Sequence, residues 1–220
     1  MTTTTTTALV GFDTETTGTD PAHDRIVTAA FTGDAGAVNL LLNPGVPIPA
    51  AAVAVHGITD ETARRDGMPA AEGVARIAAE LAAAWAAGAA IVGHNVRYDL
   101  TIVHHEMVRH LGRPLTVAGP VLDTLVLDKQ ADRWRRGPRT LGALTAHYGV
   151  TLTDAHTADA DAAAAVAVAV QLLDKLGTDP AELHTSQISW AARQAESLET
   201  YLRKKKDPNA TVDRRWPVAA

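Results

Sequence analysis

The sequence predicts a mixed α/β domain, with a five-stranded sheet and helices on both of its faces. Short apolar segments bounded by Gly, Asp or Pro fill the first part of the chain, which is typical of strands. From Met68 onward, segments with helical periodicity alternate with short apolar runs, the order that builds a sheet covered by helices. The 220 residues, 46% of them hydrophobic, are sufficient for one large core.

The first three strands are expected at residues 8–12, 25–32 and 37–42, with a turn at 33–36 between the second and the third. Because the links between them are short, these strands are predicted to form an antiparallel meander.

The later part of the chain alternates helices with strands. Val74, Ile77, Leu81 and Trp85 are spaced by three or four residues, so they share one helix face. Glycines follow several of these segments and are expected to end the helices. The predicted helices cover residues 68–87, 97–111, 140–148, 157–176 and about 180–206, and the predicted strands cover 89–92 and 121–122.

Composition bounds the organisation and the class of protein. Residues 1–7 are expected to be a disordered leader, 8–177 one domain, and 178–220 a C-terminal helical extension. The chain has no cysteine, which excludes disulfides and cysteine-based metal sites or nucleophiles. It has no signal-peptide pattern and no apolar run near the ~18 residues of a membrane span. We expect a soluble cytoplasmic protein without a membrane partner.

The net charge of −5 argues against a protein that coats nucleic acid nonspecifically. It is compatible with a nuclease, because a carboxylate-lined metal site concentrates negative charge in one place.

The first acidic motif is Asp13-Thr14-Glu15, at the end of the first predicted strand. Residues two apart on a strand point to the same face, so Asp13 and Glu15 aim together. Two neighbouring carboxylates repel each other unless a cation lies between them, and Mg²⁺ and Mn²⁺ prefer such oxygen ligands. The alternative for this motif alone is a solvated strand end.

The second motif, residues 93–99, follows an apolar strand and places Asp99 in the first turn of a helix. The helix dipole favours an acid there, which is the purely structural explanation. The location still indicates a site, because open α/β sheets bind ligands at the carboxyl ends of their strands.

The third motif, residues 156–161, opens the long alanine-rich helix. Positions five apart on a helix lie roughly 140° around the axis, so His156 and Asp161 converge only if His156 lies on the entering loop. Asp159 competes with Asp161 as a ligand, and the spacing favours Asp161. Acids of an ordinary helix N-terminus beside a surface histidine are the alternative.

Together the three motifs resemble the DEDDh family of 3′→5′ exonucleases, the DnaQ-like proofreading type of the DNA polymerase III epsilon subunit. The resemblance covers residues 9–176, and the tail resembles stand-alone actinobacterial members. The segments that also resemble the family are Val55–Thr59, Asp123–Thr124, Gly142–Leu144 and His147–Gly149.

The resemblance implies a ribonuclease H-like fold in which Asp13, Glu15, Asp99 and Asp161 hold two divalent cations, Mg²⁺ or Mn²⁺. It also implies that His156 acts as the general base. Glu15 and the backbone near Thr14 and Thr16 are expected to hold the terminal 3′-hydroxyl, so that nucleoside 5′-monophosphates are released.

Three further residues are candidates for substrate binding: His56, Asn95 and Arg139. His56 either stacks on the terminal nucleotide or packs within its loop. Arg139 belongs to a basic stretch with two possible explanations. Either the stretch follows a nucleic-acid backbone, with Trp134 stacking on a base, or it is a solvated loop. The other basic members of this stretch are Arg133, Arg135 and Arg136.

We therefore expect an exonuclease that acts on DNA 3′ ends, preferably single-stranded, in repair or proofreading. RNA or short oligoribonucleotides are the first alternative substrate. A catalytically weak nucleic-acid-binding or polymerase-associated module is the second alternative, and the sequence identifies no polymerase-binding segment.

Overall fold

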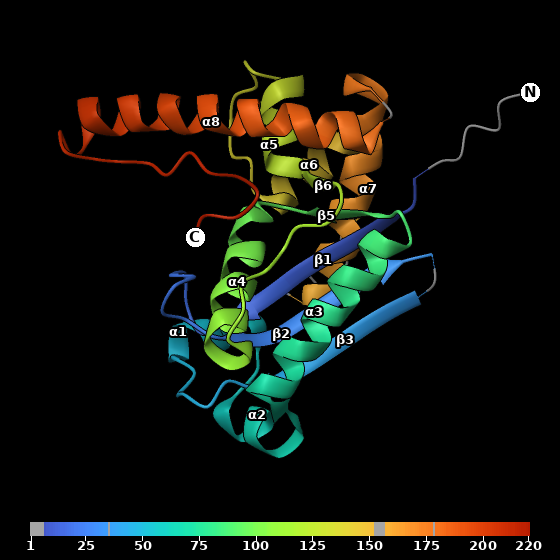
Figure 1. Ribbon diagram of the computed structural model, residues 1–220. Helices are drawn as coiled ribbons and strands as arrows, with labels where there is room; N and C mark the ends of the chain where they lie inside the picture. Colours follow the sequence, from blue (N-terminus) through green and yellow to red (C-terminus); the bar gives the residue numbers. More distant parts are fainter. Residues whose placement is uncertain (1–6, 35, 152–156, 178) are drawn as a thin grey trace, which may run out of the picture.

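A computed structural model of the chain describes residues 7–34, 36–151, 157–177 and 179–220. Its centre is a six-stranded sheet in the order β4-β3-β2-β1-β5-β6 (Figure 1). The predicted mixed α/β class with helices on both faces is confirmed, and the sheet has one strand more than the five expected.

The first three strands form the predicted meander. They are β1 (Leu9–Thr16), β2 (Ile26–Gly33) and β3 (Gly36–Asn43), and each pairs antiparallel with the next. On the other side of β1, β5 (Ala90–Gly93) and then β6 (Val121–Asp123) add in parallel. The parallel strands β1, β5 and β6 therefore present their carboxyl ends at one edge of the sheet.

The additional strand, β4 (Met68–Pro69), corrects the predicted helix 68–87. These two residues pair in parallel with Leu42 and Asn43 of β3, and α3 begins only at Ala70 and runs to Ala86. Pro69 fits the helix N-terminus because a helix needs no N–H donor at its entry. A strand of only two residues is too short to show an alternating pattern in the sequence.

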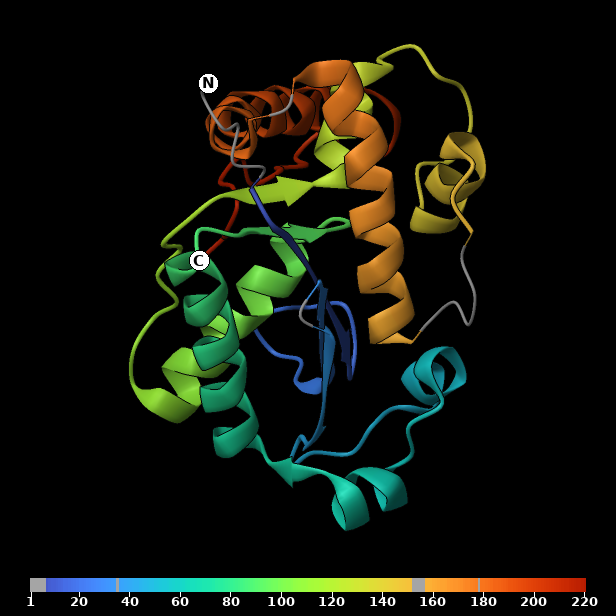
Figure 2. The same cartoon turned by 90° about the vertical axis from the view of Figure 1, so that its right-hand side faces the viewer.

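Helices cover both faces of the sheet (Figure 2). α3 packs with α4 (Arg97–Leu111) on one face, and α7 (Ala158–Leu176) crosses β1 and β2 on the other. Phe12, Ile26, Ile77 and Leu100 are fully buried on the α3–α4 side, where they form the larger core.

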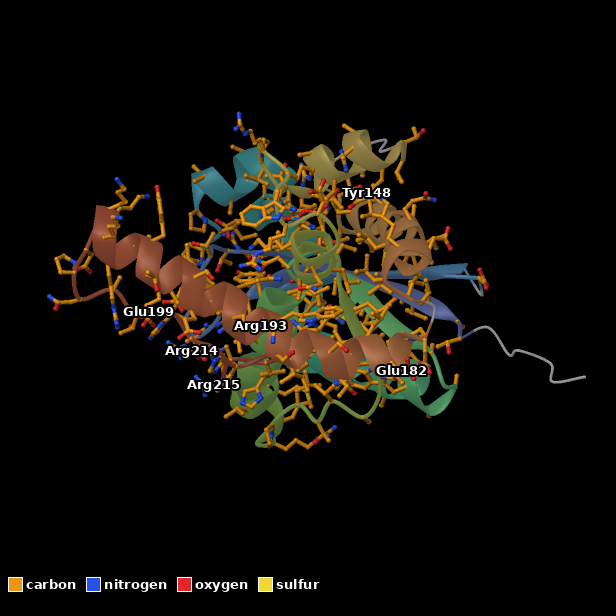
Figure 3. The ribbon with its side chains drawn as sticks, turned by 90° about the horizontal axis from the view of Figure 1, so that it is seen from above. Tyr148, Glu182, Arg193, Glu199, Arg214 and Arg215 are labelled. Carbon is orange, nitrogen blue, oxygen red and sulfur yellow. The ribbon has the colours of Figure 1, made fainter. Side chains whose placement is uncertain are left out.

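The end of the chain packs onto the last strands. α8 (Pro180–Lys205) lies beside β6 and α5 (Thr124–Ala131), and α6 (Leu141–Tyr148) lies against α7. Figure 3 shows α8 crossing this end of the molecule. Trp216 of the following tail is buried in the larger core. The division of the chain at residue 177 stays a prediction.

Three helices were not predicted from the sequence: α1 (Ala50–His56), α2 (Asp60–Asp66) and α5. α1 has no buried residue and α2 only Ala63, so neither carries an apolar stripe that reveals a helix. Within the described parts of the chain, no helix combines the length and the apolar character that crossing a membrane requires.

Candidate functional site

The candidate site lies where β1 extends beyond its neighbour β5. β5 pairs with β1 only from Leu9 to Gly11, whereas β1 continues to Thr16. The second half of β1 therefore has one edge without a strand partner, and its polar groups are available to side chains from other elements. Asp13 and Glu15 lie on this half and, as predicted, share one face.

Asp99 binds to the free edge of β1 from α4. Its Oδ1 accepts a hydrogen bond from the backbone N–H of Thr14 at 3.0 Å and another from the Thr14 hydroxyl at 2.6 Å. Asp99 lies in the first turn of α4, as the sequence predicted, and is 4% exposed. Thr14 thus fixes the second acidic motif to the first.

Asp161 is brought to the cluster by a close contact between α7 and β1. A Cβ added to Gly11 would lie 2.4 Å from the carbonyl oxygen of Ala162, so the helix backbone rests directly on the strand. Asp161 precedes Ala162, and its carboxylate lies with those of Asp13 and Glu15. One oxygen of each of these three carboxylates lies within 4.8 Å of the others.

Burial and mutual repulsion govern the electrostatics of this acidic cluster, which consists of Asp13, Glu15, Asp99 and Asp161. Desolvation, followed by the charges of Asp99, Glu15 and Asp161, raises the pKa of Asp13 well above its usual range. Burial and the charge of Asp161 raise the pKa of Glu15 to about 7. Burial raises the pKa of Asp99 to about 7, against the hydrogen bonds from Thr14.

No basic residue among those described offsets these shifts in Asp13, Glu15 or Asp99. A group of carboxylates without an internal cation is the donor set that hard divalent metals require. The acidic cluster therefore fits Mg²⁺ or Mn²⁺ chemically.

Asp159, the competing acid of the third motif, lies apart from the three converging carboxylates. It accepts a hydrogen bond from the Asn39 side chain at 3.4 Å, and that bond and one from Thr157 contribute to lowering its pKa. Asp159 and Asn39 line a groove of about 240 Å³ that also includes Glu15. Asp161 lies with Asp13 and Glu15, and its role as the metal ligand stays a prediction.

His56 lines the same groove as Glu15. Its Nδ1 accepts a hydrogen bond from the backbone N–H of Ile58 at 3.1 Å, while its Nε2 is buried. Burial lowers the pKa of His56. A hydrogen bond between His56 and the backbone of Thr16 opposes this shift and places the ring beside the end of β1. Stacking of His56 on a nucleotide stays a prediction.

The predicted contacts of Thr14 and Thr16 with substrate are untested, and both side chains have other partners here. Both donors of Thr14 are used by Asp99. The Thr16 hydroxyl contacts the Gly18 carbonyl at 2.6 Å and the Tyr98 hydroxyl at 2.8 Å. The sequence reasoning missed these positioning contacts, because neighbouring residues of one motif do not reveal which distant element they meet.

Asn95 and Arg139 form their hydrogen bonds with residues outside the acidic cluster. Asn95 has a positive φ of 58°, a conformation that asparagine tolerates, and its N–H binds Asp123 at 2.9 Å. Arg139 forms an ion pair with the fully buried Asp128. Arg139 therefore stabilises the loop before α6, and its predicted binding to substrate is untested.

His156, the predicted general base, lies outside the described residues. His94 of the second motif contacts the Thr124 hydroxyl at 2.9 Å, and burial lowers its pKa to about 4. His94 therefore packs within the second motif as a neutral side chain.

Comparison with known proteins agrees with this geometry. A family described as Exonuclease matches residues 10–169. The DNA polymerase III subunit epsilon-like protein of Rhodobacter capsulatus is 36% identical over 159 residues, which cover 68% of this chain and 21% of that protein. The PolC-type DNA polymerase III of Lacticaseibacillus paracasei is 30% identical over 156 residues, 69% of this chain and 10% of the relative. The chain thus spans only about a fifth and a tenth of these two relatives.

Solved structures share the fold. Exonuclease I of E. coli, in complex with a dA16 oligonucleotide, superposes with a TM-score of 0.68 at 22% identity, covering 87% of this chain and 45% of that one. Exonuclease I from Methylocaldum szegediense has a TM-score of 0.64 at 25% identity, with coverages of 89% and 46%. The ribonuclease H-like fold is thereby confirmed. Since the family match covers most of its length, the chain belongs to the exonuclease family.

Proposed function

We propose that this protein is a metal-dependent 3′→5′ exonuclease that hydrolyses single-stranded DNA from its 3′ end and releases nucleoside 5′-monophosphates. The observation that carries the proposal is the gathering of carboxylates from β1, α4 and α7 at one edge of the sheet, in a member of the exonuclease family. The direction of cleavage and the substrate follow from the resemblance of its three motifs.

Asp13, Glu15, Asp99 and Asp161 would hold two divalent cations. Bound there, such ions stabilise the charge that develops on the attacking and leaving oxygens of a phosphodiester. The close approach of these acids supports this role, because their repulsion in the absence of a cation makes cation binding favourable.

The chain's own residues would orient the reacting groups. Thr14 fixes one oxygen of Asp99, which leaves the other oxygen of that carboxylate for ligation. The groove beside Glu15, with His56 and Asn39 on its walls, would receive the terminal nucleotide. His156 would accept the proton of the attacking water, an assignment that rests on the sequence motif.

DNA is the preferred substrate in this proposal. The E. coli exonuclease I that shares this fold was solved with a DNA oligonucleotide, and the opening motif resembles the polymerase epsilon type. RNA differs by its 2′-hydroxyl, so comparing the two substrates is the decisive control.

The test uses DNA and RNA oligonucleotides of one sequence, labelled at the 5′ end, with Mg²⁺, Mn²⁺ or EDTA. We expect a ladder that shortens from the 3′ end on DNA, requires metal, and disappears with Asp13→Ala. A ladder on RNA alone would reassign the substrate. Full activity of Asp13→Ala, or of the wild type in EDTA, would overturn the metal mechanism.

A further inference from the structure

A large groove lies between α5, the loop that follows it, and α8. Its volume is about 490 Å³, and we call it the α5–α8 groove. Its described lining residues are Lys129, Gln130, Arg133, Trp134, Arg139, Trp190, Arg193, Gln194, Ser197 and Leu198.

The α5–α8 groove is cationic. No acidic residue belongs to its described lining, whereas four basic residues do. Arg139 is neutralised by Asp128. Lys129, Arg133 and Arg193 have no ion pair within 4.0 Å among the described residues. Arg133 and Arg193 are also exposed, so their charges are open to an anion, whereas Lys129 is half-buried near Asp123 and Asp128.

Two tryptophans stand among these cations. Trp134 is 83% exposed, an unusual position for the largest apolar side chain, and the Arg133 guanidinium lies 5.3 Å from its ring. Trp190 packs against the larger core and against a second core cluster beside α7, which includes Leu122 and Leu172, and it forms a fixed part of the wall. Free aromatic faces between phosphate-binding cations are the combination that single-stranded nucleic acids bind.

A second groove adjoins the α5–α8 groove. It shares Lys129, Gln194 and Leu198 with the first groove and reaches Asn95, two residues before α4, the helix that carries Asp99. The second groove therefore reaches the carboxyl ends of β5 and β6, on the same side of the sheet as the end of β1.

The arginines of the second groove all form ion pairs. Arg97 lies 3.7 Å from Asp213, and Arg214 lies 3.6 Å from Glu199. Figure 3 shows Arg193 on the middle of α8 and Arg214 beside Glu199 nearer the helix end. Among the described residues of the two grooves, the cations without an ion pair are therefore Lys129, which lines both grooves, and Arg133 and Arg193 of the α5–α8 groove.

We propose that the α5–α8 groove binds the 5′-ward part of the single-stranded nucleic acid whose 3′ end lies at the acidic cluster. The inference rests on the proposed function for the identity of that strand. Arg133, Arg193 and Lys129 contact the phosphates, and Trp134 stacks on a base. The C-terminal helix α8 is then part of the substrate-binding surface.

Binding is measured by fluorescence anisotropy with a labelled dT20 oligonucleotide in EDTA, where no hydrolysis occurs. The variant Arg133→Gln/Trp134→Ala/Arg193→Gln replaces three exposed residues and should leave the fold intact. Its affinity should fall at least about fivefold from the loss of stacking alone. The slope of log K against log salt should decrease by about 1.4 for the two removed cations.

The matched control is Lys204→Gln/Lys205→Gln, which removes two exposed cations at the end of α8, outside the groove. It should bind dT20 with unchanged affinity and slope. Equal effects of the two variants, unchanged binding by the groove variant, or no binding by the wild type would each overturn the inference. Displacement of dT20 by poly-glutamate at an equal concentration of negative charges would also overturn the inference. The groove would then bind an acidic polypeptide as well as it binds a nucleic acid.

Turnover separates this inference from the proposed function. On dT20 the groove variant should have a raised KM, while its hydrolysis of the dinucleotide dT2, too short to reach the groove, should equal that of the wild type. Absence of hydrolysis by the wild type on both substrates overturns the proposed function, and the anisotropy result still decides the groove. Equal kinetics of variant and wild type on dT20 contradict the groove alone.

Discussion

At the scale of single residues, the carboxylates of the acidic cluster are held close together although their negative charges repel one another. Two full charges 4.8 Å apart repel by roughly 3 kcal/mol at an effective dielectric constant of about 20. Backbone packing at Gly11 and the hydrogen bonds of Thr14 keep the carboxylates in place. The cluster is thus preorganised for a cation.

Asp161 and Asp159 are two residues apart, with the same chemistry and different surroundings. Asp161→Asn should reduce exonuclease activity more than about 100-fold, because it removes a ligand from the cluster. Asp159→Asn should retain most of the activity, since Asp159 contacts Asn39 instead. Steady-state assays on labelled DNA compare the two, and an Asp159→Asn variant as impaired as Asp161→Asn would refute the ligand assignment.

The raised pKa of Glu15 makes stability depend on pH. The unfolded chain ionises Glu15 near its usual value of 4.5, and the folded protein does so near 7. Between these values the folded state binds more protons, so Glu15 lowers the unfolding free energy as pH rises. In EDTA, Glu15→Gln should therefore become progressively more stable than the wild type from about pH 4.5 to pH 7.

Thermal unfolding of both proteins across this pH range measures the difference. Comparing them cancels titrating groups that Glu15 does not influence, such as His94, whose lowered pKa acts in the opposite direction. Asp13, whose pKa the charge of Glu15 raises, adds to the same difference. Added Mg²⁺ should stabilise the wild type more at pH 8 than at pH 5, because the metal binds the ionised carboxylates. A difference between the two proteins that does not change with pH would contradict the buried, repelled position of Glu15.

At the scale of elements, the contact of α7 with β1 at Gly11 aligns the third motif with the first. Gly11→Ala places a methyl group 2.4 Å from the Ala162 carbonyl, so α7 must move away. We expect a loss of about 1–3 kcal/mol in the free energy of unfolding. Activity should fall further than the unfolded fraction explains, because Asp161 moves with the helix.

Gly142→Ala is the control for this substitution. Gly142 lies in α6 with nothing within 4 Å of an added Cβ. The variant should be as stable as the wild type or up to about 1 kcal/mol more stable, with normal activity. Urea unfolding and the labelled-DNA assay give both quantities, and equal behaviour of the two glycine variants would show that Gly11 does not set the helix position.

Gln187 of α8 completes the hydrogen bonding of the edge strand β6. Its Oε1 accepts from the Asp123 N–H at 2.8 Å, and its Nε2 donates to the Val121 carbonyl at 2.9 Å. Gln187→Ala leaves two buried backbone groups unpaired and should cost about 2–4 kcal/mol in urea unfolding. Ser189→Ala, on the exposed side of the helix, should cost little, and an equally small effect at Gln187 would contradict the role of α8 as the cover of β6.

Elements with strong local signals could be predicted from the sequence. The predicted helix 97–111 coincides with α4, because Gly112 adopts the left-handed conformation that ends a helix. α5 escaped prediction because it follows directly on β6, with Asp123 as its cap and no turn between them. Exposed α1 escaped for lack of an apolar stripe.

At the scale of the whole molecule, three sequence motifs identified the acids but not how they meet. That Asp13 and Glu15 share a face follows from strand periodicity alone. That Thr14 binds Asp99 depends on β5 being shorter than β1, which is a property of the assembled sheet. The α5–α8 groove depends likewise on how α8 returns to the sheet, and only its Arg133, Trp134 and Arg139 belonged to a stretch that carried a signal in the sequence.

The most direct test of the account is the binding of Mn²⁺ to the full chain, followed by isothermal titration calorimetry at pH 8 in the absence of nucleic acid. Acids from β1, α4 and α7 that converge on one place predict saturable binding of two ions, which Asp13→Asn weakens strongly and Asp159→Asn leaves unchanged. Binding that is absent, or that is the same in the wild type and Asp13→Asn, would contradict a metal site at the end of β1.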